Sequence, residues 1–238
     1  MASTSEVGHN KNVANFKSVC LILAEMGALY NPSNNVIKLQ ALDPLNDILK
    51  ATIQDLNEKI PIYKNAVAAR ETDIKPLSKL STRVHNSFRA TQASLADKEN
   101  MLAMVKKIRG DQRPKKVNPE TADKETISTS QMSYDSRIAN LDIMVNFIAS
   151  QHIYEPNEED LQVFSLKTYQ QRLERLSIAV NQASNSILTA RTARNNALYN
   201  GENNIISLAN SIKDYLKSLG APGNPYYKAV VKLKFKNQ

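Results

Sequence analysis

One phrase occurs twice in this chain, and its repetition constrains the fold more than any other feature. Residues 30–42 read YNPSNNVIKLQAL and residues 154–166 read YEPNEEDLQVFSL, 124 positions later. The apolar pattern continues at this offset to Arg70 and Arg194, and at an offset of 128 after residue 200. Upstream, Ala14 corresponds to Ala139, one position out of step. We interpret the chain as a tandem duplication, since a fixed internal period is the signature of repeated structural units.

Each copy is predicted to form about three helices. Asn118-Pro119 and Asp43-Pro44 are typical helix starts, because a capping side chain precedes a proline that needs no amide partner. The first helices are expected at about 10–30 and 119–152, breaks at 73–76 and 200–203, and ends at about Ile108 and Leu219-Gly220. The prediction is an all-α, elongated helical bundle with repeats at 1–109 and 119–220, a basic linker at 110–118 and an extended tail at 221–238.

The second helix of each copy carries the clearest apolar period. In the second copy the apolar positions alternate steps of three and four, which is typical of a coiled-coil seam: Leu166, Tyr169, Leu173, Leu176, Val180, Ala183, Ile187 and Ala190. The first copy repeats the seam with polar intrusions at Thr52 and Lys59, and Pro61 is expected to bend it. Long helices of this kind predict a rod with much exposed flank.

The net charge of +8 is concentrated in two stretches, the linker region and the C-terminal tail. The candidate polyanion-binding residues are Lys106, Lys107, Arg109, Arg113, Lys115, Lys116, Lys232, Lys234 and Lys236. Such clusters bind phosphates by counterion release, or stay solvated as a linker and a solubilising tail. No aromatic ladder or recognised nucleic-acid module accompanies the charge, so nucleic acid remains an open alternative.

The C-terminal tail alternates apolar and basic residues from Val231 to Lys236, which is the period of an extended strand. Its candidate interaction residues are Val231, Leu233, Phe235, Tyr226 and Tyr227. The apolar face is expected to dock either on its own bundle or in a groove of a second copy.

The sequence offers little chemistry. The histidines His9, His85 and His152 are far apart, and Glu6 with His9 is an isolated Glu-x-x-His spacing. No glycine-rich phosphate loop occurs, and the single cysteine, Cys20, reads as a small buried apolar residue. We therefore predict no enzymatic activity, no cofactor and no metal. Arg70 and Arg194 fall in register, and are expected to extend their charged ends from the seam or to pair with carboxylates.

The most apolar window, 13–30, is interrupted by Lys17 and Glu25, so it reads as a buried helix rather than a membrane span. The N-terminus lacks the pattern of a secretory signal. A cytoplasmic location is expected, with membrane contact only after rearrangement.

A set of short motifs lies within about the last 90 residues: Tyr154–Glu158 with Leu161, Ala193–Tyr199, Lys213–Tyr215, Tyr227-Lys228 and Leu233–Phe235. In these motifs the chain resembles a family of uncharacterised, all-helical bacterial proteins. It implies a helical fold and carries over no functional residue.

Three functions remain open. The first is a structural or scaffolding protein that self-associates through helical flanks and the tail. The second is an adaptor that binds nucleic acid or another polyanion through the basic stretches, and the third is a helical pore-forming protein. We favour the first, with a second copy of the chain as the partner.

Overall fold

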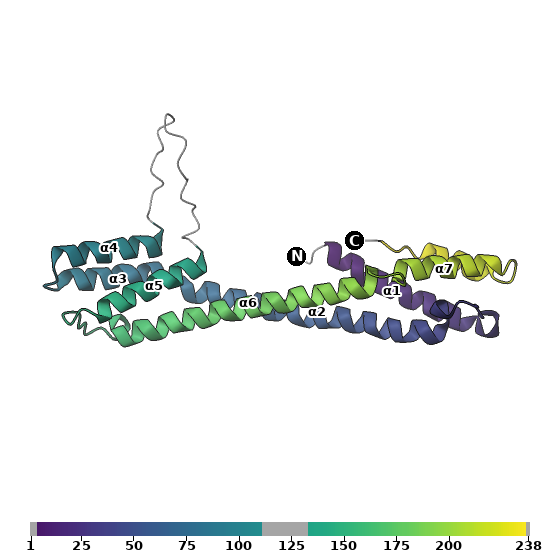
Figure 1. Ribbon diagram of the computed structural model, residues 1–238, viewed down its shortest axis with the longest axis horizontal. Coiled ribbons are helices and arrows are strands. Elements are labelled where there is room, and N and C mark those ends of the chain that lie inside the picture. The colour runs from purple at the N-terminus through teal and green to yellow at the C-terminus, as the bar shows by residue number, and fades with distance from the viewer. Residues whose placement is uncertain (1–3, 111–132, 237–238) are drawn as a thin grey trace, which may run out of the picture. The chain divides into compact units, whose positions relative to one another are not determined.

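The computed structural model describes residues 4–110 and 133–236, and every regular element within them is a helix, which confirms the all-α class (Figure 1). The α-helices are α1 (Thr4–Glu25), α2 (Leu39–Ile74), α3 (Leu77–Ala90), α4 (Leu95–Arg109), α5 (Tyr134–Ala149), α6 (Val163–Tyr199), α7 (Ile205–Ser218) and α8 (Asn224–Lys232). Short 3₁₀ turns are η1 (Gly27–Leu29), η2 (Asn35–Ile37) and η5 (Glu159–Leu161).

The chain divides into two compact units. Unit 1 comprises Met1–Ile62 and Ser184–Gln238, and unit 2 comprises Tyr63–Ala183. The predicted repeats, 1–109 and 119–220, divide the chain differently, because each compact unit takes helices from both. The long helices α2 and α6 each begin in one unit and end in the other.

Unit 1 packs α8 against α1 and α7, α7 against α1, and the turn η2 against α7. Phe16, Val19 and Leu23 of α1 are fully buried beside Leu208, Ile212 and Leu216 of α7. Cys20 is buried among them, as predicted, and burial raises the pKa of its thiol to about 11. The apolar stripe of α1 therefore closes the core of this unit.

Unit 2 packs α4 between α3 and α5, and the turn η5 against α3. Its buried residues include Leu77, Val84 and Phe88 of α3, with Met101 of α4 and Leu141 of α5. Burial of apolar area at about 25 cal/mol per Å² is the main source of stability for such a core. Every residue of this core lies between Ile74 and Leu173.

Helix α2 begins at Leu39, before the predicted start at Asp43-Pro44. Lys38 opens the helix, since its carbonyl accepts hydrogen bonds from the amides of Ala41 (2.9 Å) and Leu42 (3.1 Å). Pro44 lies close enough to the helix start that its missing amide costs only one bond. The burial of Leu42 outweighs that loss, so the predicted start was wrong by about one turn. The helix also continues through Pro61.

The third helix of the first copy was predicted as one element to about Ile108, but it is broken into α3 and α4. Ser94 is the N-cap of α4: its hydroxyl accepts from the amide of Asp97 at 3.1 Å and donates to the Asp97 carboxylate at 2.7 Å. This cap satisfies the open amide of Asp97 in the first turn of the new helix. The break lets α4 turn back along α3, which a single helix could not do.

The C-terminal region was predicted to be extended from 221, but residues 224–232 form the helix α8. Pro225 lies in the first turn, where proline is well tolerated, and Val230 reaches the core with 0% exposure. Only Leu233 and the residues after it leave the helix. The alternation seen in the sequence therefore begins inside a helical turn and not in a strand.

The remaining predicted helix boundaries agree with the structure in part. Breaks separate α2 from α3 at residues 75–76 and α6 from α7 at 200–204, and Gly220 follows α7 with a φ of +68°. Helix α1 ends earlier than predicted, at Glu25, and η1 follows. Helix α5 begins after the Ser133 cap; the predicted start at Asn118-Pro119 lies outside the described residues. The predicted seam of α6 is buried or half-buried at each of its positions.

Candidate functional site

The first candidate site is a groove in unit 1 between α1 and α2, with a volume of about 340 Å³. It is lined by Asn10, Val13, Ala14 and Lys17 of α1 and by Asn46, Asp47, Lys50 and Ile53 of α2. Lys17 and Lys50 are exposed, and with Asp47 they leave the lining with a net positive charge. We call it the basic groove.

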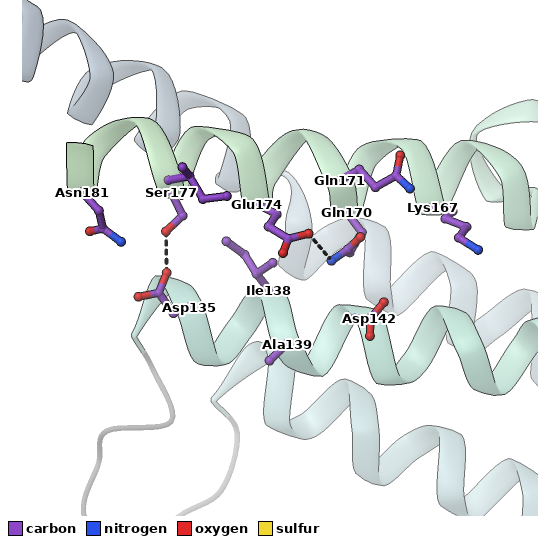
Figure 2. Close-up of a pocket in the computed structure, with 11 residues that line it drawn as sticks. Asp135, Ile138, Ala139, Asp142, Lys167, Gln170, Gln171, Glu174, Ser177 and Asn181 are labelled. Atoms are coloured by element: carbon purple, nitrogen blue, oxygen red, sulfur yellow. Dashed lines mark hydrogen bonds between the residues drawn. The ribbon is translucent and has the colours of Figure 1, made fainter. Parts of the chain in front are cut away.

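The second is a groove in unit 2 between α5 and α6, with a volume of about 500 Å³ (Figure 2). It is lined by Asp135, Ile138, Ala139 and Asp142 of α5 and by Lys167, Gln170, Gln171, Glu174, Ser177, Ile178 and Asn181 of α6. Three carboxylates against one lysine give this lining a net negative charge. We call it the acidic groove.

Hydrogen bonds fix several side chains of the acidic groove. Ser177, which is 5% exposed, donates its hydroxyl proton to the carboxylate of Asp135 (Figure 2). Gln170 Nε2 donates to Glu174 Oε2 at 3.5 Å, and Asn146 Nδ2 donates to Asp142 Oδ2 at 3.1 Å. The carboxylates are thus held by neutral donors, which leaves their negative charge uncompensated in these contacts.

The residues that line the two grooves correspond to one another under the internal repeat predicted from the sequence. Residues of α1 are paired with residues of α5 at the offset of 125 seen between Ala14 and Ala139, and residues of α2 with residues of α6 at the offset of 124. With these offsets, all eight residues of the basic groove correspond to residues that line the acidic groove. The pairs are Asn10 with Asp135, Val13 with Ile138, Ala14 with Ala139, Lys17 with Asp142, Asn46 with Gln170, Asp47 with Gln171, Lys50 with Glu174, and Ile53 with Ser177. The α1 and α5 pairs Val13 with Ile138 and Ala14 with Ala139 keep an apolar side chain, whereas Lys17 with Asp142 and Lys50 with Glu174 differ in the sign of their charge.

The predicted interaction residues of the tail lie against their own chain. Tyr226, Tyr227, Leu233 and Phe235 pack on the core of unit 1, and Val231 is half-buried. Two asparagines of α1 hold the backbone of the tail. Asn12 donates to the carbonyl of Lys236 at 2.7 Å and accepts from its amide at 3.1 Å, and Asn15 donates to the carbonyl of Lys234 at 2.7 Å. Of the two docking modes predicted, the structure contains the one within the chain.

A buried polar cluster lies beside this tail. Asn12 Nδ2 also donates to the hydroxyl of Tyr199 at 2.9 Å, and His9 Nδ1 lies 2.7 Å from the same hydroxyl. His9, Asn12 and Arg194 are each less than 5% exposed. Burial raises the pKa of Tyr199, although the hydrogen bond from Asn12 and the charge of Arg194 oppose this. The cluster therefore joins α1, the end of α6 and the tail, all within unit 1.

The two basic stretches lie in different units. Lys106, Lys107 and Arg109 occupy the last turn of α4 in unit 2, where cations favour the helix dipole. Arg113, Lys115 and Lys116 lie outside the described residues. Lys232, Lys234 and Lys236 are exposed in unit 1, opposite the half-buried apolar residues with which they alternate.

The in-register arginines have different neighbours. The guanidinium of Arg70, in unit 2, stacks 4.1 Å from the centre of the Tyr134 ring, which is a cation–π contact. Arg194, in unit 1, bonds the side-chain oxygen of Asn195 at 2.9 and 3.1 Å. The expected carboxylate pairing of these two arginines is not among these contacts.

Within residues 4–110 and 133–236, no group of three or more His, Cys, Asp or Glu side chains is arranged to hold a metal ion. No helix in this part of the chain is both long enough and apolar enough to cross a membrane. Neither groove was predicted from the sequence, because apolar periodicity indicates the buried seam and not the exposed flank of a helix. The signal that the sequence does offer is the opposite charge at positions related by the predicted repeat, such as Lys17 with Asp142 and Lys50 with Glu174.

Comparison with known proteins gives no assignment: no protein-family model matches the chain, and neither a curated protein nor a solved structure matches it.

Proposed function

We propose that this chain is a non-enzymatic scaffolding protein that associates with copies of itself through its helical flanks. The observation that carries the proposal is the pair of grooves, which present the same lining positions in both units with different charge. Flank grooves between long helices are surfaces into which another helix can pack. A chain that carries two versions of one such surface is suited to contact two neighbours.

We further propose that the two grooves arose by tandem duplication. Several features support this. Tyr30 donates its hydroxyl proton to the carbonyl of Ile37 at 2.6 Å, and Tyr154 donates to the carbonyl of Leu161 at 3.0 Å. Helix α3 corresponds to α7 at the predicted offset of 128. The contacts also correspond: α4 packs on α3 and α5 as α8 packs on α7 and α1.

Each unit would then combine the first helix of one copy with the third helix of the other. Asn12 and Arg137 support this correspondence, because they are equivalent positions on α1 and α5. Asn12 bonds the carbonyl of Lys236 after α8, and Arg137 Nε donates to the carbonyl of Ile108 at the end of α4 at 3.0 Å. We also propose that the apolar seams of α2 and α6 pack in the manner of a coiled coil. The predicted seam positions of both helices are buried or half-buried, which supports this packing.

Light scattering after size exclusion tests the proposal on the full chain. We expect a mass that exceeds the 26.6 kDa of one chain and increases with protein concentration. A mass of one chain at every concentration would overturn self-association. If such a monomer bound heparin with an affinity that fell steeply with salt, the polyanion adaptor would replace it as the function.

The contribution of the tail is tested by the double variant Leu233→Ser with Phe235→Ser. These residues are half-buried against unit 1, so the variant releases the end of the tail while α8 and Val230 keep their places. We expect association to persist, because the flank grooves carry it. Loss of association with an unchanged circular dichroism spectrum would instead make the tail the connecting element.

A further inference from the structure

The basic groove and the acidic groove carry opposite charges at corresponding positions. Two corresponding pairs line the grooves, with a lysine in the basic groove and a carboxylate in the acidic groove. A third pair lies one turn away on α2 and α6 and has the reverse order, with the carboxylate on α2 and the lysine on α6. The inverted pairs are Lys17 with Asp142, Lys50 with Glu174, and Asp43 with Lys167. Since the apolar and small residues of the lining stay apolar or small on α1 and α5, the difference between the flanks is mainly one of charge.

This inversion decides which flanks of two chains are compatible. If two identical flanks meet about a twofold axis, equivalent positions near the axis face each other, so basic groups meet basic groups and acidic groups meet acidic groups. If a basic groove meets an acidic groove in the same manner, every inverted pair places opposite charges face to face. Like-charge contacts reject the wrong pairing, and opposite charges favour the right one.

The charged groups are available for such a contact. Lys17, Lys50 and Glu174 are exposed, and Asp142 is half-buried at the groove wall. Apolar surface accompanies them: Ile178, which is 48% exposed, lines the acidic groove, and Val13 with Ile53 lines the basic one. An interface needs this combination, because apolar area supplies affinity while charges supply register.

We propose that the acidic groove of one chain binds the basic groove of a second copy. The inference rests on the proposed self-association and names the two surfaces that perform it. The contact is heterologous, because it joins two different surfaces of the same chain. Each pair of bound chains therefore keeps one free groove of each kind, so association continues beyond the dimer or closes into a ring.

Charge reversal tests the proposal with two complementary variants of the full chain. The first, Lys17→Asp with Lys50→Glu, makes both grooves acidic, and the second, Asp142→Lys with Glu174→Lys, makes both basic. We expect either variant alone to associate at least about tenfold more weakly than the unchanged chain, since each charge pair at an interface contributes to binding. An equimolar mixture should associate again, because the acidic groove of the first meets the basic groove of the second.

A matched control for the first variant keeps its change of net charge and moves that change away from the grooves. Lys64→Asp with Lys79→Glu alters exposed lysines of α2 and α3 that line neither groove, and we expect it to associate as the unchanged chain does. If the reversed variants associate normally, or their mixture stays monomeric, or the control fails equally, the pairing of grooves is wrong while self-association stands. If the unchanged chain itself is monomeric at low salt, the proposed function fails first.

Discussion

His85 is a titratable side chain in the core of unit 2, where it is 9% exposed on α3. Burial lowers the pKa of its imidazole below the ordinary value of 6.5, the positive charge of Arg89 lowers it further, and a hydrogen bond with Asn86 opposes both. The unfolded chain therefore binds this proton more readily than the folded chain. The stabilisation is complete above about pH 6.5 and is lost as the pH falls through the folded pKa.

We predict that the free energy of unfolding decreases between about pH 7.5 and about pH 5.5, and that His85→Gln removes part of this decrease. Urea denaturation at the two pH values measures it. His152→Gln is the control, because His152 is exposed and its replacement disturbs no core. An equal pH dependence in the His85 variant would show that other groups cause it.

Asn12 is a second single residue with a large structural role, because its side chain fixes the end of the tail. It is 1% exposed and makes three hydrogen bonds, two to the backbone of Lys236 and one to the hydroxyl of Tyr199. We predict that Asn12→Leu lowers the free energy of unfolding by about 1–3 kcal/mol, because the tail backbone loses its partners. Trypsin should also cleave after Lys234 faster.

Asn15→Ala provides the comparison for Asn12, since its bond to Lys234 is exposed to solvent and competes with water. We expect a loss well below that of Asn12→Leu. Equal cleavage rates in both variants and the unchanged chain would show that the tail is held mainly by Leu233 and Phe235.

The sequence predicted which tail residues face inward, through the alternation with lysine. It could not indicate Asn12 as their partner, because no local pattern links residues more than 220 positions apart.

At the scale of elements, a buried tyrosine precedes each of the two long helices. Tyr30 and Tyr154 are 8% and 5% exposed, and each bonds a carbonyl in the 3₁₀ turn that precedes α2 or α6. Burial raises the pKa of the Tyr154 hydroxyl to about 12, so it stays protonated and remains a donor at neutral pH.

We predict that Tyr30→Phe and Tyr154→Phe lower the free energy of unfolding by similar amounts, about 0.5–1.5 kcal/mol each. Each variant removes one buried hydrogen bond while the ring keeps its packing. Thermal denaturation of the two single variants measures the comparison. A large cost at one tyrosine and none at the other would contradict the equivalence of the two links, and with it the proposed duplication.

The elements also show where sequence patterns mislead. The α2–α3 break and the glycine after α7 follow directly from Pro76 and Gly220, whose backbone preferences act locally. The α3–α4 break depends on the weaker signal of Ser94 and Asp97, which resembles many solvent-exposed helix segments. Asp43-Pro44 looked like a helix start, but the burial of Leu42 extends the helix beyond it.

For the whole molecule, the sequence indicates two copies, yet the compact units do not follow their boundaries. The reason is that α2 and α6 are long enough to begin in one unit and end in the other, so the helix that follows each of them lies in a different unit from the helix that precedes it. Apolar periodicity predicts which residues are buried, but it does not say against which partner they are buried. The predicted seam positions of α6 are accordingly buried or half-buried, while the two compact units group the helices differently from the predicted repeats.

This grouping makes the two units unequal in how they form. Unit 1 needs residues up to Ile62 and residues from Ser184 onward to meet, whereas unit 2 is one continuous segment from Tyr63 to Ala183 whose core residues all lie within it. Joining distant segments costs more loop-closure entropy than joining near ones.

We predict that a fragment of residues 63–183 folds on its own, with a helical circular dichroism spectrum and a cooperative thermal transition. The fragment 1–62, which holds α1 without α7 and α8, should lack a cooperative transition until residues 184–238 are added. A fragment 63–183 that melts without cooperativity would show that unit 2 depends on unit 1 for its stability.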